Sequence, residues 1–208
     1  MFVSAELRWF WPGSLPGGVE AWFEGGPVPP GGGQSRVDEY LVDPGQTEVG
    51  LKKRGASAGV EIKGLVGHGR DTPAPFAGRV EIWSKWNSRR LAIDGLPRVR
   101  VRKRRLVRKF DTAAGTVSEV ALDADERVTG DPDRRLDRGC QLELVAIALG
   151  GEADNWWSIG LEAFGELSTV ADSLDATLSH LSAGAPALTG GLGLSYPAWL
   201  SKVADGLS

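Results

Sequence analysis

The sequence has few of the residues that metal centres and disulfide frameworks require. Its 208 residues include one cysteine, Cys140, and two histidines, His68 and His180. A single cysteine cannot form an intramolecular disulfide bond, and it supplies only one thiolate ligand. The composition therefore excludes a disulfide-stabilised fold and a multi-cysteine zinc site, and it leaves little for a histidine-based metal cluster.

Long hydrophobic runs are also missing. No window approaches the roughly 18 apolar residues that a membrane-spanning helix needs. The first residues, MFVSAELRWFW, place Glu6 and Arg8 within an apolar stretch and show no basic leader, which argues against a secretory signal. We therefore expect a cytoplasmic protein with no membrane partner.

A large net charge is absent as well, but the near-neutral total of −3 hides an uneven distribution. Residues 1–109 contain 19 basic and 11 acidic side chains, whereas residues 110–208 contain 5 and 16. Residues 98–109 alone carry eight basic side chains and no acidic one. The first half of the chain is thus suited to meet an anion, while the acidic second half discourages indiscriminate binding to nucleic acid.

Alternation of apolar and polar residues predicts β-strands over much of the chain. Residues 3–11 place Val3, Ala5, Leu7 and Trp9 at alternate positions, which is the period of a strand. The remaining strands are predicted at residues 37–42, 48–54, 60–66, 79–86, 98–110, 117–122, 140–149 and 156–164. So many strands with few helices between them predict an α+β protein, mainly antiparallel β, that forms a closed or strongly curved antiparallel barrel or tunnel.

Helices are predicted mainly near the end of the chain, and VEAWFE at residues 19–24 is the one stretch between the first two strands that can form a short helical turn. Apolar residues follow a helical spacing over residues 166–182, which indicates a C-terminal helix that caps the sheet. We expect one barrel domain over residues 1–184. A Gly/Ala/Pro-rich tail over 185–208 would follow it, with Ser195 as the N-cap of a short last helix. The glycine clusters at residues 31–33 and 67–69 are expected in loops, because neither has the strand-to-helix context of a dinucleotide-binding motif.

Charged residues recur inside the predicted strands, and two architectures accommodate them. In a half-exposed sheet the charged face is solvated, which is the common outcome for antiparallel strands and the one that periodicity alone favours. In a wide barrel the apolar face is covered from outside, and the charged face lines a polar interior. The density of arginine shifts the balance to the barrel, because neighbouring like charges repel unless an anion or carboxylates neutralise them.

Five charged motifs follow one another along the chain: SAELRW, GLKKRG, EIKG, VRVRKRRL and CQLELVAI. Their order resembles the CYTH superfamily, the triphosphate tunnel metalloenzymes, which characteristically begin with an ExExK strand. SAELRW places Ser4, Glu6 and Arg8 at those three positions, and CQLELVAI places Gln141 and Glu143 where the family tends to show two glutamates. GLKKRG, EIKG and VRVRKRRL supply the later basic positions, namely Lys52 and Arg54, then Lys63, then Arg102 and Arg104. A shift of one residue, to Lys103 and Arg105, is left open for the last pair. Because Ser4 and Gln141 replace expected glutamates, metal affinity is expected to be lower than in the family, whereas the basic positions are better preserved.

The resemblance implies an antiparallel tunnel that binds a triphosphate-type substrate. Glu6, Arg8 and Lys63 are the candidate catalytic residues, and Glu6, Glu81 and Glu143 would hold Mg²⁺ or Mn²⁺ if the protein is catalytic. The candidate substrate-binding residues are Lys52, Arg54, Arg79, Lys85, Arg100, Arg102 and Arg104. Glu162 alternates to the face opposite its apolar neighbours, and we expect it to be solvated.

Three functions remain open at this point. The first is metal-dependent hydrolysis of an inorganic or organic triphosphate, and the second is non-catalytic binding of polyphosphate or of a phosphorylated metabolite, which needs no metal. The third is an RNA-binding or interaction module with residues 98–109 exposed. It is the least favoured, because nucleic-acid sites interleave aromatic with basic residues and the tryptophans of this chain lie elsewhere. The expected partner is a phosphorylated small molecule or polyphosphate, not a nucleic acid.

Overall fold

The computed structural model describes residues 2–43, 45–55, 59–130, 135–151, 153 and 155–204. Within these residues the chain forms ten strands and three helices. The strands are β1 (Phe2–Pro12), β2 (Gly31–Leu41), β3 (Val49–Arg54), β4 (Val60–Thr72), β5 (Gly78–Ser88), β6 (Arg98–Asp111), β7 (Ser118–Val120), β8 (Gly139–Leu149), β9 (Trp156–Gly165) and β10 (Leu192–Gly193). The helices are α1 (Gly17–Glu24), α2 (Val170–Ser182) and α3 (Tyr196–Ala204).

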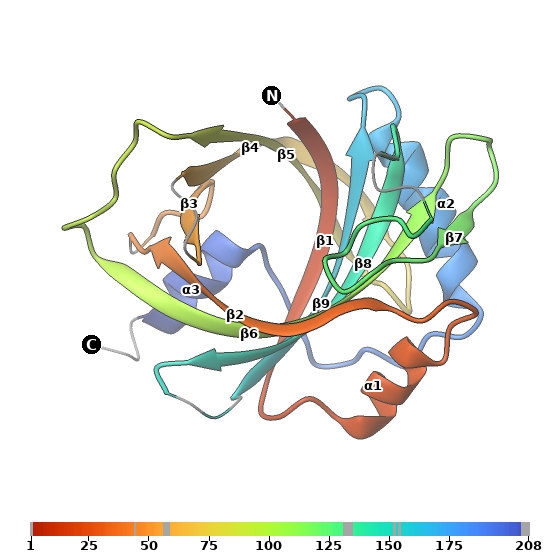
Figure 1. Ribbon diagram of the computed structural model, residues 1–208, viewed down its shortest axis with the longest axis horizontal. Helices are drawn as coiled ribbons and strands as arrows, with labels where there is room; N and C mark the ends of the chain where they lie inside the picture. Colours follow the sequence, from red (N-terminus) through yellow and green to blue (C-terminus); the bar gives the residue numbers. More distant parts are fainter. Residues whose placement is uncertain are drawn as a thin grey trace.

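Eight of these strands close into an antiparallel barrel (Figure 1). The order around the barrel is β1, β5, β4, β3, β2, β6, β8 and β9. β1 and β9 pair from Val3 opposite Gly165 to Pro12 opposite Trp156, and this pairing closes the barrel. The prediction of a mainly antiparallel α+β fold with a closed barrel and a C-terminal helix is confirmed.

A hydrophobic layer covers the outside of β1, β8 and β9. Leu7 and Trp9 of β1 point outward and are buried with Leu142 of β8 and with Leu174 and Leu178 of α2. Phe23 of α1 is fully buried in the same layer. Because the apolar face of these strands is covered from outside, their polar face lines the interior of the barrel.

The second hydrophobic core lies inside the barrel at one end and is formed with α3. Trp199 of α3 is fully buried and stacks on Phe10 of β1, with ring centroids 4.5 Å apart. Tyr40, Val101 and Ile147 belong to the same cluster. The C-terminal segment therefore returns to the barrel and fills part of it, and Figure 1 shows α3 framed by β2, β3 and β6.

Both glycine clusters lie in strands, so their assignment to loops is wrong. Residues 31–33 open β2, where the register with β6 shifts between Gly32 and Ser35. Gly32 and Gly33 have φ of 90° and 89°, a backbone conformation that L side chains rarely adopt. Residues 67–69 lie within β4, which runs six residues beyond the predicted end and is irregular on both sides of Gly67 and His68. These glycines permit bulges rather than ending the strands.

Smaller differences concern element ends. The predicted helix over 166–182 begins at Val170, after a turn in which Thr169 N donates to Glu166 O at 2.9 Å. The predicted strand over 117–122 shortens to the three residues of β7. Ser195 Oγ accepts from Ala198 N at 3.4 Å at the start of α3, as expected of an N-cap. No helix in the described part of the chain is both long and apolar enough to cross a membrane.

Candidate functional site

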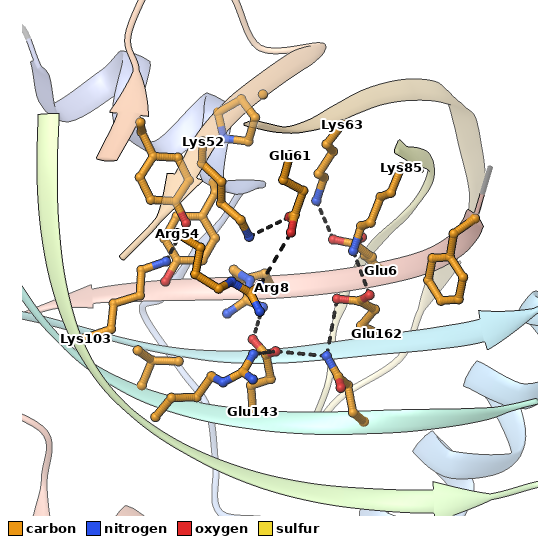
Figure 2. Close-up of a pocket in the computed structure, with 18 of the residues that line it drawn as sticks. Glu6, Arg8, Lys52, Arg54, Glu61, Lys63, Lys85, Lys103, Glu143 and Glu162 are labelled. Carbon is orange, nitrogen blue, oxygen red and sulfur yellow. Dashed lines mark hydrogen bonds and ion pairs between the residues drawn. The ribbon is translucent and has the colours of Figure 1, made fainter. Parts of the chain in front are cut away.

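A cavity of about 410 Å³ occupies the interior of the barrel (Figure 2). Each of the eight barrel strands contributes at least one charged side chain to its wall, and Glu126 reaches it from the segment after β7. Tyr196 and Pro197 of α3 complete the wall. The basic residues are Arg8, Arg36, Lys52, Arg54, Lys63, Lys85, Lys103 and Arg105, and the acidic ones are Glu6, Glu61, Glu126, Glu143 and Glu162.

Strand alternation explains why charged residues converge here. On β1, Leu7 and Trp9 are buried in the outer layer, so Glu6 and Arg8 between them point inward. Gly160 of β9 lies opposite Arg8, and a Cβ atom there would be 2.4 Å from the Arg8 guanidinium carbon. The glycine therefore leaves the space that the arginine occupies.

Glu6 is the centre of one group of ion pairs. Its carboxylate lies 2.5 Å from Lys63 Nζ and 2.7 Å from Lys85 Nζ, and Ser4 Oγ donates to it at 2.7 Å. Lys85 also lies 2.6 Å from Glu162. Burial alone would raise the pKa of Glu6, but the two lysines outweigh it and hold that pKa well below its usual range. Glu6 is therefore an anion whose charge is already neutralised.

Glu143 is the centre of a second group. Arg8 Nη2 and Arg105 Nη1 lie 2.6 and 2.7 Å from its two carboxylate oxygens, and Gln141 Nε2 donates to it at 2.9 Å. Burial opposes ionisation, but Arg105 and Arg8 hold the pKa of Glu143 well below its usual range. Arg105 also pairs with Glu126. The two arginines and the two carboxylates of this group balance in charge.

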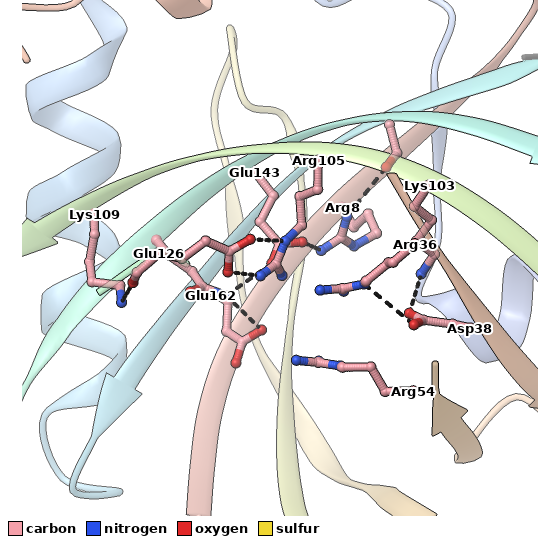
Figure 3. Close-up of polar contacts among 12 residues, drawn as sticks. Arg8, Arg36, Asp38, Arg54, Lys103, Arg105, Lys109, Glu126, Glu143 and Glu162 are labelled. Atoms are coloured by element: carbon pink, nitrogen blue, oxygen red, sulfur yellow. Dashed lines mark hydrogen bonds and ion pairs between the residues drawn. The ribbon is translucent and has the colours of Figure 1, made fainter. Parts of the chain in front are cut away.

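The wall formed by β2, β3 and β6 carries more positive than negative charge. Lys52 and Arg54 share Glu61, at 2.6 and 3.5 Å, and Arg36 and Lys103 share Asp38, at 3.3 and 3.4 Å. Four cations thus face two carboxylates, and three of the four contacts exceed 3.2 Å. Figure 3 shows Arg36 and Arg54 extending from their strands toward the cavity. We name Arg36, Lys52, Arg54 and Lys103 the basic wall.

Lys103 is the deepest member of the basic wall. Its side chain is 4% exposed, and its amine donates to Tyr40 Oη at 2.5 Å and lies 3.7 Å from the ring centroid of Tyr196. Burial and the nearby cations Lys52, Arg36 and Arg8 lower the pKa of this amine well below its usual value, although Asp38 opposes the shift. Burial likewise lowers the pKa of Lys52 and of Lys63.

Seven of the predicted site residues line the cavity. They are Glu6, Arg8, Lys52, Arg54, Lys63, Lys85 and Glu143. Arg79 and Glu81 instead border a smaller cavity of about 110 Å³ beside His68, which Glu6 and Arg8 also line. Burial raises the pKa of Glu81, whose carboxylate accepts from the Trp83 indole at 2.9 Å.

The placement of Arg100, Arg102 and Arg104 in the cavity is wrong. Arg100 and Arg102 border a different depression, lined also by Val37 and Ala148, and Arg104 pairs with Glu20 of α1 at 2.8 Å. Successive side chains of a strand point to opposite faces, so either the odd-numbered or the even-numbered side chains of β6 face the interior. Leu106 and Phe110 belong to the outer layer, so the even-numbered arginines face outward with them. The alternative register with Lys103 and Arg105 inside is the one that the structure adopts.

The three carboxylates expected to hold a divalent cation do not form one open site. Glu6 and Glu81 are paired across β1 and β5 and both border the smaller cavity, but Glu6 and Glu143 each have two cations as partners. In the described ranges no three His, Cys, Asp or Glu side chains are grouped to hold a metal ion. The residues present therefore do not fit the metal site of the resemblance.

Several residues of the cavity were not predicted, namely Arg36, Glu61, Glu126 and Glu162. Glu162 was expected in solvent, but it points inward and pairs with Lys85. Alternation with Leu161 and Ala163, which are buried in the outer layer, is the signal that places it inside once the layer is known. Glu126 lies in an acidic segment between strands, and nothing in its sequence marks it as a cavity residue.

The comparisons with known proteins identify no family. No family model matches the chain, and no curated protein matches it. Among solved structures, the PH1819 protein from Pyrococcus horikoshii OT3 matches with a TM-score of 0.43 and 13% sequence identity, over 98% of this chain and 99% of that one. The function is therefore argued from this chain's own residues.

Proposed function

We propose that the barrel binds a polyanion with a triphosphate-type chain, inorganic or organic, and that it acts as a binding protein. The observation that carries this proposal is the convergence of eight basic side chains on one cavity. Five carboxylates line the same cavity, and a sixth, Asp38, pairs with Arg36 and Lys103. Arginine and lysine together suit a phosphate chain, because guanidinium groups pair with phosphate oxygens in two-pronged fashion and ammonium groups neutralise charge.

The basic wall is the part of the cavity where we expect the anion to bind. Three of its four pairs, those of Arg36, Arg54 and Lys103, are longer than the 2.5–2.7 Å contacts of Glu6, and its cations outnumber its carboxylates. An anion that enters the cavity therefore gains most from Arg36 and Arg54, whose guanidinium groups have capacity left after their long contacts with Asp38 and Glu61. The remaining cations of the cavity add to the field without leaving their partners.

Calorimetric titration with inorganic tripolyphosphate tests the proposal. Arg36→Gln combined with Arg54→Gln is expected to weaken binding at least about tenfold, because a lost charged hydrogen bond costs roughly 1.5–3 kcal/mol. The matched control is Arg100→Gln combined with Arg102→Gln, which removes the same charge from outside the cavity. Equal loss in both variants, or no saturable binding by the unchanged protein, would contradict the proposal.

Hydrolysis of the bound chain is measured in the same samples as phosphate release. The candidate catalytic residues Glu6, Arg8 and Lys63 line the cavity. Lys63 and Lys85 neutralise Glu6, however, and the sequence supplies Ser4 and Gln141 where further carboxylates were expected. We therefore expect tripolyphosphate to be bound without turnover, and phosphate release above the protein-free rate would restore the enzymatic alternative.

A further inference from the structure

Two carboxylates of the cavity are paired with lysine and arginine side chains, whereas a metal-dependent site needs carboxylates that are free to bind the metal ion. Glu6 contacts two lysines within 2.7 Å, and Glu143 contacts two arginines within 2.7 Å. The side chains of Glu6, Glu143, Arg8 and Arg105 are all no more than 11% exposed. Separating such pairs leaves buried charges without partners, which costs several kcal/mol for a broken pair.

A divalent cation would add to this cost. To reach Glu6 or Glu143 it would have to displace Lys63 and Lys85 or Arg8 and Arg105, whose side chains cannot leave the barrel wall. Each displaced cation would then face the metal at short range, and like charges in a poorly solvated cavity repel strongly. The lysines and arginines therefore already occupy the positions beside Glu6 and Glu143 that a metal ion would need.

A metal-free polyanion meets the opposite situation. It adds negative charge to a cavity whose surplus is positive at the basic wall, and it breaks no ion pair when it binds there. The same chain complexed with Mg²⁺ carries two fewer negative charges and offers fewer free oxygens to Arg36, Arg54 and Lys52. The protein and the metal thus compete for the same phosphate oxygens.

We propose that the barrel takes its polyanion as the metal-free chain and that Mg²⁺ weakens binding by competing with the protein for that chain. This inference rests on the proposed function and adds to it the ionic form of the ligand. Lys63, Lys85, Arg8 and Arg105 occupy the carboxylates that a metal would need, and the basic wall takes the charge-neutralising role that a divalent ion has in metal-dependent phosphate sites.

Tripolyphosphate titrations of the unchanged protein provide the first test, one in EDTA and one in excess MgCl₂ at matched ionic strength. We expect tight, saturable binding in EDTA and an affinity lower by about tenfold or more in MgCl₂. Binding only in the presence of Mg²⁺, or tighter binding with it, overturns this inference while leaving the proposed function standing. Binding in neither buffer overturns the proposed function itself.

Two substitutions at neighbouring positions provide a second test, because they are expected to change the affinity for tripolyphosphate in different directions. In EDTA, Glu143→Gln should bind tripolyphosphate at least as tightly as the unchanged protein, because it frees Arg8 and Arg105 for the anion. Gln141→Glu should bind about tenfold more weakly, because it adds a carboxylate beside Glu143 and Glu162. The reverse order in MgCl₂, with Glu143→Gln losing binding and Gln141→Glu gaining it, would identify these positions as metal ligands. If Glu143→Gln fails to fold, the titrations of the unchanged protein and of Gln141→Glu still test whether the barrel prefers the metal-free chain.

Discussion

The Lys103 amine shows how a single residue couples burial to charge in this barrel. It is enclosed by Tyr40, Tyr196 and Asp38, and its pKa lies well below the usual value of 10.5, mainly because of burial. A lysine whose folded-state pKa is lowered loses its proton more readily in the folded than in the unfolded protein. The unfolded state then binds more protons between the two pKa values, and the free energy of unfolding rises with pH across that window.

Comparison with Lys103→Met isolates this effect from that of the other lysines. The variant has no titrating amine at this position, so the free energy of unfolding of the unchanged protein should rise relative to it as pH increases toward 10.5. The relative gain is about 1.4 kcal/mol for each unit by which folding lowers the pKa. Urea denaturation of both proteins at neutral and at alkaline pH measures it. If the free energies of unfolding of the two proteins change equally with pH, the pKa of Lys103 is not lowered by folding.

At the scale of elements, α3 decides how much of the barrel interior is open. Trp199 stacks on Phe10 and meets Trp156 edge to face at 5.5 Å, and Tyr196 contributes its ring to the wall of the cavity beside Arg8 and Lys103. α3 is thus part of both the inner core and the site. Its sequence predicts a short helix, but nothing in that sequence shows that the helix would enter the barrel.

Trp199→Ala is expected to lower the free energy of unfolding by roughly 3–5 kcal/mol, because it leaves a large cavity in the inner core. Trp86→Ala is the matched control, since it removes the same side chain from a position that is 44% exposed and should cost less than half as much. Chemical denaturation monitored by circular dichroism measures both. A loss at Trp199 no greater than the loss at Trp86 would show that α3 is not integral to the core.

At the scale of the whole molecule, the fold mixes charges that the chain keeps apart. The first half of the sequence carries the basic surplus, yet Glu126, Glu143 and Glu162 of the acidic second half face its cations across the cavity. Closing β9 onto β1 brings the two halves together. The interior is therefore a set of ion pairs with a local positive surplus at the basic wall, in place of a uniformly basic tunnel.

Ligand binding to such an interior should stabilise the whole barrel. Tripolyphosphate at about 100 times its dissociation constant contributes about 2.7 kcal/mol, which corresponds to a rise in melting temperature of roughly 5–11 °C for a chain of this size. Differential scanning fluorimetry measures the shift, and added salt should reduce it because screening weakens anion binding. An unchanged melting temperature at saturating tripolyphosphate would contradict binding to the folded state.

Much of the fold follows from local pattern, whereas the site depends on registers that no local pattern contains. The sequence pattern predicts β1, β3, β5, β8 and β9 to within about two residues. β1 and β9 alternate between an apolar and a mostly polar face, whereas β8 is a nearly continuous apolar run that contributes to both cores. β6 carries apolar and basic residues on both faces, so its inward set is decided only when Leu106 and Phe110 pack into the outer layer. The bulges at Gly32 and Gly67 are similarly invisible to alternation, because they interrupt it.

The sequence by itself determined that this protein is a mainly antiparallel β-barrel with charged strand faces and too few histidines and cysteines for a metal cluster built on them. Those properties depend on composition and on periodicity within single strands. Only the tertiary structure decided which cations share a carboxylate and which face an anion. Ion pairing depends on distances of a few ångströms between strands far apart in the chain, and barrel closure sets these distances.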